Sequence, residues 1–278
     1  RVEPRTTRED RVAIIGSGPA GLSCAFYLGR QGFRVMVFEA LPVLGGLLRT
    51  GIPPYRLPPE VLDAELRVFE GLPVTFVKNR RLGENLVKAD LSRFDAVFLG
   101  VGRQASRKMG VKGEDQPGVY EGTSFLRGRA VGGGVKLKGR VAVVGGGNTA
   151  MDCARVALRQ GAEPVVVYRR SRPDMPAFAE EVDEARDEGV QFVFQTAPAA
   201  VVGRDGRVAA LRCLRTQPGA PGAAGRRAAE PVPGSEFEIA CESVLVAAGE
   251  EVDRGPLDGL WPKNGRVFSG GDLENGAT

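Results

Sequence analysis

The amino-acid sequence predicts an α/β protein built from two similar βαβ-based domains, the second inserted into the first. The first observation behind this prediction is an internal repeat, because residues 11–39 and 140–168 align on one another without a gap. The second is the order of features in each copy: an apolar run, a glycine turn, a segment of helical periodicity, a further glycine and another apolar run. This order is typical of a βαβ unit in a parallel sheet, whose strands are buried on both faces.

The bounds of the expected elements follow from the same patterns. In the two copies, the apolar runs 12–15 and 141–144 predict buried strands, and Gly32 and Gly161 stand where a helix end requires a left-handed residue. Outside the copies we predict strands at 94–100, 190–195, 243–249 and 266–271, a helix at 180–188, a hairpin of 208–214 with 237–240, and a surface loop at 217–234, which is rich in proline, glycine and alanine.

The glycine turn of the first copy has the spacing of a dinucleotide-binding fingerprint. Gly16, Gly18 and Gly21 form G-x-G-x-x-G between the first strand and the helix. The first glycine permits a tight turn, the second lets a pyrophosphate approach the helix N-terminus, and the third lets helix and strand pack closely. Glu39 ends the second strand, where a carboxylate can accept hydrogen bonds from an adenosine ribose. A purely structural turn is the alternative, since glycine turns between strand and helix are common.

The second copy differs from the first at the end of its second strand. The three small residues of its turn are Gly145, Gly147 and Ala150. Tyr168 stands in place of the acidic residue, and Arg169 and Arg170 follow it directly. Arg172 lies nearby. Guanidinium groups there suit the 2′-phosphate of NADPH, to which each charge-assisted hydrogen bond contributes about 1.5–3 kcal/mol. The alternative is that these arginines cover a solvated loop.

Two later predicted strands end in glycine, at the sheet edge where ligands of α/β proteins bind. Gly249 follows one of these strands, and Gly270, Gly271 and Asp272 follow the other. Asp272 can accept a hydrogen bond from a ribityl hydroxyl. An ordinary turn aspartate is the alternative.

Cysteine and histidine usage excludes several kinds of site. Cys24, Cys153, Cys213 and Cys241 are far apart and form no C-x-x-C pair, which argues against a redox dithiol, an iron–sulfur cluster and a zinc site. The chain contains no histidine, so a histidine base is excluded. We therefore expect no catalytic side chain and no metal site. A disulfide reductase resembling thioredoxin reductase would need the missing dithiol and is disfavoured.

The overall charge and hydropathy narrow the class of protein further. The formal net charge is +4, and no basic run of the nucleic-acid-binding type occurs. No stretch approaches the ~20 apolar residues of a membrane helix, and residues 1–10 lack the apolar region of a signal peptide. We therefore expect a cytoplasmic protein with no nucleic-acid partner and no membrane span. Because the chain begins at Arg1 and ends at Thr278, just after a glycine turn, we also expect it to belong to something larger.

Several segments of the chain, taken in order, resemble one protein family. They are GSGPAGLSCAFYL, FEALPVLGGLLRTGIPPYRLP, FDAVFLGVG, VAVVGGGNTAMDCARVALRQGA, VVVYRRSRPDMPAF, GRRAAEPVPGSEFEI and VFSGGD. Together they span nearly the whole chain and resemble the small (β) subunit of NADPH-dependent glutamate synthase and its relatives. These relatives include the flavin and NADPH part of dihydropyrimidine dehydrogenase and the flavin subunits of ferredoxin:NADP oxidoreductases.

The resemblance implies two Rossmann-like dinucleotide-binding domains. An NAD(P)H domain of residues 121–249 would be inserted into an FAD domain of residues 1–120 and 250–278. The FAD contacts implied by the resemblance are Gly16, Gly18, Gly21, Glu39, Gly46, Leu47, Arg56 and Asp272, and cofactor contacts are also expected at Pro19, Ala20, Ala40 and Gly271. Those implied for NADPH, or for NADH in its place, are Gly147, Asn148, Thr149, Arg169 and Arg170. Further cofactor contacts are expected at Gly102 and Gly249.

The resemblance also implies a function in electron transfer. Hydride would pass between NADPH and FAD, and electrons would leave through iron–sulfur centres of the same chain or of a partner, which would be a ferredoxin-type protein or a catalytic subunit. Members of the family usually carry an N-terminal cysteine-rich domain, which this sequence lacks, and continue past the GGD turn into a helix that faces the flavin. The alternative function is a structural subunit of a larger redox complex that binds nucleotide without turnover.

Overall fold

The structure, a computed structural model, describes residues 2–221, 227–260 and 265–276. The chain divides into two compact units, of which one comprises Arg1–Ala105 and Glu251–Thr278 and the other comprises Ser106–Glu250. The second unit is therefore inserted into the first along the chain. None of the helices in the described ranges is long and apolar enough to cross a membrane.

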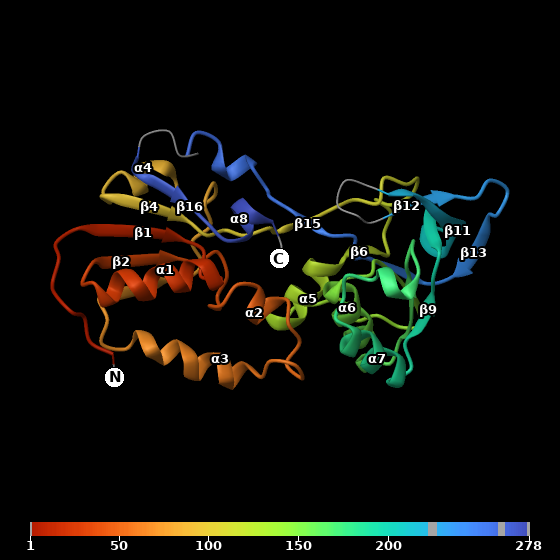
Figure 1. The fold of residues 1–278 in the computed structure, drawn as a ribbon, viewed down its shortest axis with the longest axis horizontal. Coiled ribbons are helices and arrows are strands. Elements are labelled where there is room, and N and C mark those ends of the chain that lie inside the picture. Colours follow the sequence, from red (N-terminus) through yellow and green to blue (C-terminus); the bar gives the residue numbers. More distant parts are fainter. Residues whose placement is uncertain (1, 222–226, 261–264, 277–278) are drawn as a thin grey trace. The chain divides into compact units, whose positions relative to one another are not determined.

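The first unit contains a five-stranded parallel sheet in the order β16-β4-β1-β2-β3 (Figure 1). Its strands are β1 (Arg11–Ile15), β2 (Arg34–Phe38), β3 (Val74–Val77), β4 (Ala96–Leu99) and β16 (Val267–Ser269). Its helices are α1 (Pro19–Arg30), α2 (Leu47–Thr50), α3 (Pro59–Leu66), α4 (Lys88–Leu91) and α8 (Asp272–Asn275), with 3-10 turns at Arg67–Phe69 and Gly255–Leu257. Ile14 and Val37 belong to one buried cluster, and Ile15 and Leu99 belong to another. Neighbouring residues of β1 thus enter different cores, as expected of a parallel sheet that is covered on both faces.

The second unit contains a second five-stranded parallel sheet in the order β6-β14-β7-β8-β9. Its strands are β6 (Val119–Glu121), β7 (Arg140–Val144), β8 (Glu163–Val167), β9 (Gln191–Val193) and β14 (Ser243–Val246). Its helices are α5 (Gly122–Ala130), α6 (Asn148–Arg159) and α7 (Ala179–Asp187), with a 3-10 turn at Arg172–Asp174. Val141 and Val143 pack into one core, whereas Ala142 and Val144 pack into another. Both faces of this sheet are therefore buried as well.

The first two strands of each repeat pair in the same register in the two sheets. Ile15 lies opposite Phe38 in the first sheet, and the equivalent Val144 lies opposite Val167 in the second. Each glycine turn therefore meets the end of the neighbouring strand at the same edge of its sheet. The units divide at residues 105 and 106, whereas the sequence analysis placed the first division at residue 120. The reason is that the segment 106–121 contacts the inserted unit along its length. The hydroxyl of Ser106 pairs with that of Thr123, the carbonyl oxygen of Lys112 accepts the N–H of Val201, and β6 pairs with β14.

An antiparallel sheet completes the second unit and corrects one prediction. Its strands are β10 (Thr196–Arg204), β11 (Arg207–Pro221), β12 (Arg227–Pro231) and β13 (Phe237–Ala240). The predicted pairing of 208–214 with 237–240 is confirmed. The predicted loop at 217–234 is wrong in part, because β11 continues to Pro221 and pairs with β12, although residues 222–226 lie outside the described ranges. Since β12 is exposed along most of its length, no apolar alternation marked it in the sequence.

The remaining local predictions agree with the structure apart from strand lengths. Gly32 has φ +85° after α1 and Gly161 has φ +86° after α6, which confirms the left-handed helix ends. The predicted helix at 180–188 is α7, and the other predicted strands are all present. Several strands end before their predicted limits because glycines such as Gly249 and Gly271, both with positive φ, turn the chain. Two short strands, β5 (Ala105–Ser106) and β15 (Glu250–Glu251), pair with each other.

Candidate functional site

The first glycine turn lies between β1 and α1 and is tightly packed. Gly16 has φ +99°, and a Cβ on Gly21 would lie 1.9 Å from the carbonyl oxygen of Gly16. The helix can therefore approach the turn only when residue 21 is glycine. Gly18 is the N-cap of α1 and Pro19 its first residue, and no side chain of the described part of the chain caps this end. Backbone N–H groups at such a helix N-terminus can bind phosphate.

A second glycine segment approaches the same turn. Gly46 is the N-cap of α2, has φ +54°, and a Cβ on it would lie 2.7 Å from the Cα atom of Gly18. The N–H of Gly45 donates to the carbonyl oxygen of Ser17 at 3.1 Å. The structure thus brings Gly46 and Leu47, the first residue of α2, to the glycine turn.

Glu39 follows β2 and is buried, with 6% of its surface exposed. Its Oε2 atom accepts hydrogen bonds from the N–H of Ser17 at 3.0 Å and from the hydroxyl of Ser17 at 2.6 Å. Its Oε1 atom accepts one from the N–H of Leu41 at 2.8 Å. A carboxylate has about four lone-pair sites, so these three bonds leave capacity for one further donor. Ser17 was not among the predicted site residues, although it stands inside the glycine motif.

The GGD turn also meets the start of α1. Gly271 is the N-cap of α8 and Asp272 its first residue, and a Cβ on Gly271 would lie 2.7 Å from the Cβ atom of Ala20. The Nε atom of Arg103 donates to the carbonyl oxygen of Asp272 at 3.0 Å. Arg103 and its neighbour Gly102 belong to the segment after β4, and the sequence offered no signal that Arg103 contacts the turn.

Two of the predicted residues in this unit lie beside these elements. Ala40 directly follows Glu39 at the end of β2. Arg56 lies in the turn before α3, where its backbone N–H donates to the carbonyl oxygen of Pro53 at 2.9 Å. The glycine turn, Glu39, Gly46 and the GGD turn are therefore gathered at the carboxyl edge of the sheet, and Arg56 stands further along the chain from α2.

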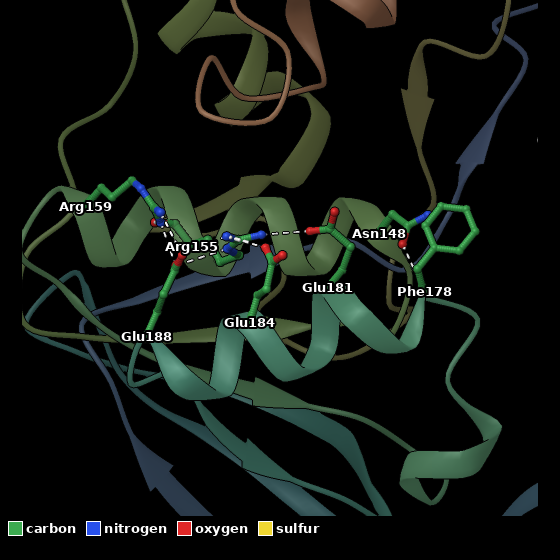
Figure 2. A network of polar contacts seen from close by, with 7 residues as sticks. All are labelled: Asn148, Arg155, Arg159, Phe178, Glu181, Glu184 and Glu188. Atoms are coloured by element: carbon green, nitrogen blue, oxygen red, sulfur yellow. Dashed lines mark hydrogen bonds and ion pairs between the residues drawn. The ribbon is translucent and has the colours of Figure 1, made fainter.

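The second glycine turn is joined to two other segments of its unit. Gly147 is the N-cap of α6, and the described residues provide no side-chain cap there. The hydroxyl of Thr149 donates to the Oε1 atom of Glu250 at 3.0 Å. The Oδ1 atom of Asn148 accepts the N–H of Phe178 at 3.0 Å, which ties the turn to the start of α7 (Figure 2). Asn148 and Thr149 were predicted as site residues, whereas Glu250, the hydrogen-bond partner of Thr149, was not.

Two further residues lie at the carboxyl edge of this second sheet. Tyr168 directly follows β8 and is 6% exposed, and its hydroxyl donates to the carbonyl oxygen of Asp174 at 2.7 Å. It therefore places a buried ring where the first unit has a buried carboxylate. Gly249 follows β14, and its carbonyl oxygen accepts the N–H of Arg107 at 2.9 Å.

The three arginines after β8 differ in their surroundings. The Nε atom of Arg170 donates to the carbonyl oxygen of Arg227 at 2.7 Å. The guanidinium of Arg172 forms an ion pair with Asp183 of α7. Arg169 is exposed, and its guanidinium has neither a hydrogen bond nor an ion pair with any residue in the described ranges. Arg169 is therefore the arginine with the most freedom to bind an anionic ligand.

An ion-pair network joins α6 to α7. Figure 2 shows Arg155 of α6 directed toward Glu181, Glu184 and Glu188 of α7, at distances of 2.8, 2.8 and 2.7 Å. The Arg155 side chain is only 5% exposed, and Arg159 adds a second ion pair to Glu188 at 2.7 Å. A buried charge without partners is strongly destabilising, so this network holds α7 along α6. The segment between β8 and α7, which carries the arginines, is thereby anchored at its far end.

Glu188 makes the stability of this helix pair dependent on pH. Hydrogen bonds from Arg159 and Arg155 lower the pKa of Glu188 from 4.5 to about 2. Because the pKa is lower in the folded state than in the unfolded chain, its contribution is present above pH 4.5 and is lost as the pH falls toward about 2. We expect Glu188→Gln to lower the melting temperature at neutral pH, and the difference from the wild type to shrink through this window. Melting curves of both proteins between about pH 2 and neutral pH measure this difference in melting temperature. A difference that does not change with pH would contradict the assignment of the pH dependence to Glu188.

The cysteine thiols are poorly suited to redox chemistry. All four cysteines are free. Burial raises the pKa of Cys24 and Cys241 to about 11 and that of Cys213 to about 12, and it raises the pKa of Cys153 well above its ordinary value. Such thiols stay protonated near neutral pH, and the thiolate is the reactive form. In the described part of the chain, no group of three or more His, Cys, Asp or Glu residues could hold a metal ion.

Two parallel sheets, each with a glycine turn between its central strand and the following helix, define a protein of the two-domain dinucleotide-binding class. A comparison with protein-family models identifies the family. The chain belongs to the pyridine nucleotide-disulphide oxidoreductases, whose family model matches residues 10–260. The predicted fold class is thereby confirmed.

Similar curated proteins confirm the resemblance found in the sequence. The NADP(+)-dependent formate dehydrogenase subunit beta of Moorella thermoacetica is 45% identical, over 98% of this chain and 41% of that protein. The glutamate synthase [NADPH] small chain of Escherichia coli is 39% identical, over 96% of this chain and 64% of that protein. The chain thus spans less than two thirds of the length of either relative.

Solved structures share the fold at low sequence identity. Mycobacterium tuberculosis FprA, in a structure with NADPH, has a TM-score of 0.80 and 22% identity, covering 98% of this chain and 80% of FprA. Lactococcus lactis thioredoxin reductase has a TM-score of 0.70 and 19% identity, covering 97% of this chain and 92% of that protein. At these identities the likeness concerns the fold.

Proposed function

We propose that the chain binds FAD on its first unit and NADPH on its second, and that hydride passes from NADPH to FAD. The observation that carries this proposal is a contrast between two equivalent strand ends. The buried carboxylate of Glu39 follows β2, whereas the buried ring of Tyr168 and the exposed Arg169 follow β8. A carboxylate at this position suits a ribose with free hydroxyls, and a guanidinium suits a ribose with a 2′-phosphate.

The first unit has the features that FAD requires. The N-terminus of α1, capped by Gly18, offers backbone N–H groups to a pyrophosphate, and Glu39 keeps one acceptor site for a ribose hydroxyl. A Cβ on Gly46 would intrude on Gly18, so only glycine at residue 46 allows the two segments to approach this closely beside the proposed pyrophosphate site. Asp272, held by Arg103, would accept a hydrogen bond from the ribityl chain.

The second unit has the features that NADPH requires. The N-terminus of α6, with Gly147 as its N-cap, offers backbone N–H groups in the same way. Arg169 would hold the 2′-phosphate, because its guanidinium has no competing carboxylate among the described residues. Arg172 is engaged by Asp183 and would contribute less.

When bound, FAD and NADPH supply the redox chemistry themselves, by transfer of a hydride. The residues of the chain then have three tasks, which are to bind the two nucleotides, to orient them and to distinguish one from the other. No thiol is required, and burial keeps all four cysteine thiols protonated near neutral pH through their raised pKa values.

We propose further that the electrons leave through an iron–sulfur centre or a ferredoxin-type protein of a partner chain or domain. Relatives of the chain are named as subunits of larger enzymes, among them the NADPH-Fe(3+) oxidoreductase subunit beta of Geobacter sulfurreducens. The four free cysteines include no C-x-x-C pair and provide no set of cluster ligands here. Free thiols also suit the reducing cytoplasm, which is the setting that we propose.

Anaerobic reduction tests this function. The chain, purified and supplied with FAD, should show the visible flavin spectrum, and NADPH should bleach it without oxygen. A protein that binds NADPH but neither retains nor reduces the flavin would instead support the alternative, a nucleotide-binding structural subunit. A protein that binds neither nucleotide would contradict both functions.

A further inference from the structure

Three consecutive carbonyl groups after β8 are held by distant parts of the chain. The carbonyl oxygens of Tyr168 and Arg170 accept hydrogen bonds from the backbone N–H groups of residues 195–196, at 3.1 and 3.0 Å. The carbonyl oxygen between them, that of Arg169, accepts a hydrogen bond from the hydroxyl of Thr216 at 2.7 Å. Among these three bonds, only the one from Thr216 is made by a side chain, so only this bond can be removed without altering the backbone.

Thr216 is itself firmly placed. It lies in β11 and is 5% exposed, and its N–H donates to the carbonyl oxygen of Gln195 at 2.8 Å. It stands opposite Pro231 of β12 in the antiparallel pair. A buried hydroxyl in a paired strand has little freedom to choose another acceptor, so its bond to Arg169 is a fixed feature of the fold.

The neighbouring strand contacts the same arginine segment. The Nε atom of Arg170 donates to the carbonyl oxygen of Arg227, which is the first residue of β12. The ribbon of β11 and β12 therefore touches the backbone of Arg169 and the side chain of Arg170. The end of β11 at 217–221 and strand β12 lie in the segment that was predicted as a loop.

We propose that Thr216 is a positioning residue for the recognition of the 2′-phosphate of NADPH. The peptide group that follows Arg169 sets the direction in which its side chain leaves the backbone, and the Thr216 hydroxyl fixes that peptide group. Thr216 thus acts through Arg169 and touches no nucleotide itself. This inference rests on the proposed binding of NADPH by the second unit.

Equilibrium titration of the full chain with NADPH and with NADH tests the proposal. Thr216→Val keeps the shape of the side chain and removes the donor, so we expect NADPH to bind about 3- to 10-fold more weakly, the effect of one hydrogen bond, while NADH binding is retained. Thr216→Ser keeps a hydroxyl and should restore NADPH affinity. Thr216→Ala serves as the second variant if valine prevents folding.

A matched control separates this role from general destabilisation. Thr123 is also a buried threonine of the second unit, 5% exposed, and its hydroxyl pairs with that of Ser106 at 2.8 Å. Thr123→Val should lower the melting temperature without changing the ratio of NADPH to NADH affinity. Equal weakening of both coenzymes by Thr216→Val, or no weakening of either, would overturn the proposal.

A double-mutant cycle with Arg169→Ala completes the test. If Thr216 acts through Arg169, adding Thr216→Val to Arg169→Ala should cause no further loss of NADPH affinity. Additive losses would show that Thr216 acts by another route and would contradict the inference. A wild-type chain that does not prefer NADPH at all would instead contradict the proposed function itself, so the two failures are distinguishable.

Discussion

Replacing Arg169 by alanine is expected to lower the preference for NADPH over NADH by about 10- to 100-fold, equivalent to about 1.4–2.8 kcal/mol. The physical reason is the loss of charge-assisted hydrogen bonds to the 2′-phosphate, which NADH lacks. Arg169 carries this effect because Arg170 and Arg172 already have partners, in the Arg227 carbonyl and in Asp183. Steady-state kinetics with both coenzymes, compared as kcat/KM, measure the change.

A matched arginine provides the control for this substitution. Arg204 lies at the end of β10, in the same unit, and is exposed like Arg169. Arg204→Ala removes the same charge from another surface and should leave the coenzyme preference as it is. If Arg169→Ala keeps the wild-type preference for NADPH over NADH, Arg169 does not bind the 2′-phosphate.

Replacing Glu39 by leucine is expected to abolish retention of FAD and to lower the free energy of unfolding by about 2–4 kcal/mol. The substitution leaves the N–H and hydroxyl of Ser17 and the N–H of Leu41 without their acceptor in a buried place. It also removes the acceptor proposed for the ribose. Flavin content per chain, read from the visible spectrum, and denaturant unfolding measure the two effects separately.

Two further variants separate the loss of FAD from the loss of stability. Leu91 lies in α4 and is 4% exposed, so Leu91→Ala should cost about 2–5 kcal/mol through a cavity while FAD is retained. Glu39→Gln keeps one acceptor oxygen and should have an intermediate effect on both measurements. Retention of FAD by a folded Glu39→Leu protein would contradict the assignment of this carboxylate.

The repeated βαβ units could be predicted because their signals are local. A strand that is buried on both faces is apolar throughout, and the glycines at 16, 18 and 21 follow such a strand directly and open a helical pattern. Glu39, Tyr168 and Arg169 were found in the same way, since each directly follows an apolar run.

The end of β11 at 217–221 and strand β12 could not be predicted for the opposite reason. Residues 217–220 and β12 are mostly exposed, and this stretch is rich in proline, glycine and alanine, so neither periodicity nor strand propensity marks it. The strands exist there because their backbones pair with each other, which a pattern of side chains does not record. Thr216 lies between the predicted strand 208–214 and the predicted loop 217–234, and it was not singled out.

The sequence by itself determined the two dinucleotide folds, their order along the chain and the residues that end their strands. Only the tertiary structure decided which of these residues have partners. It joined Arg172 to Asp183, left Arg169 without a carboxylate among the described residues, and brought Thr216 to Arg169 across 47 positions. The physical reason is that a strand or a glycine turn depends on neighbouring residues, whereas a hydrogen bond between distant residues depends on the path of the whole chain.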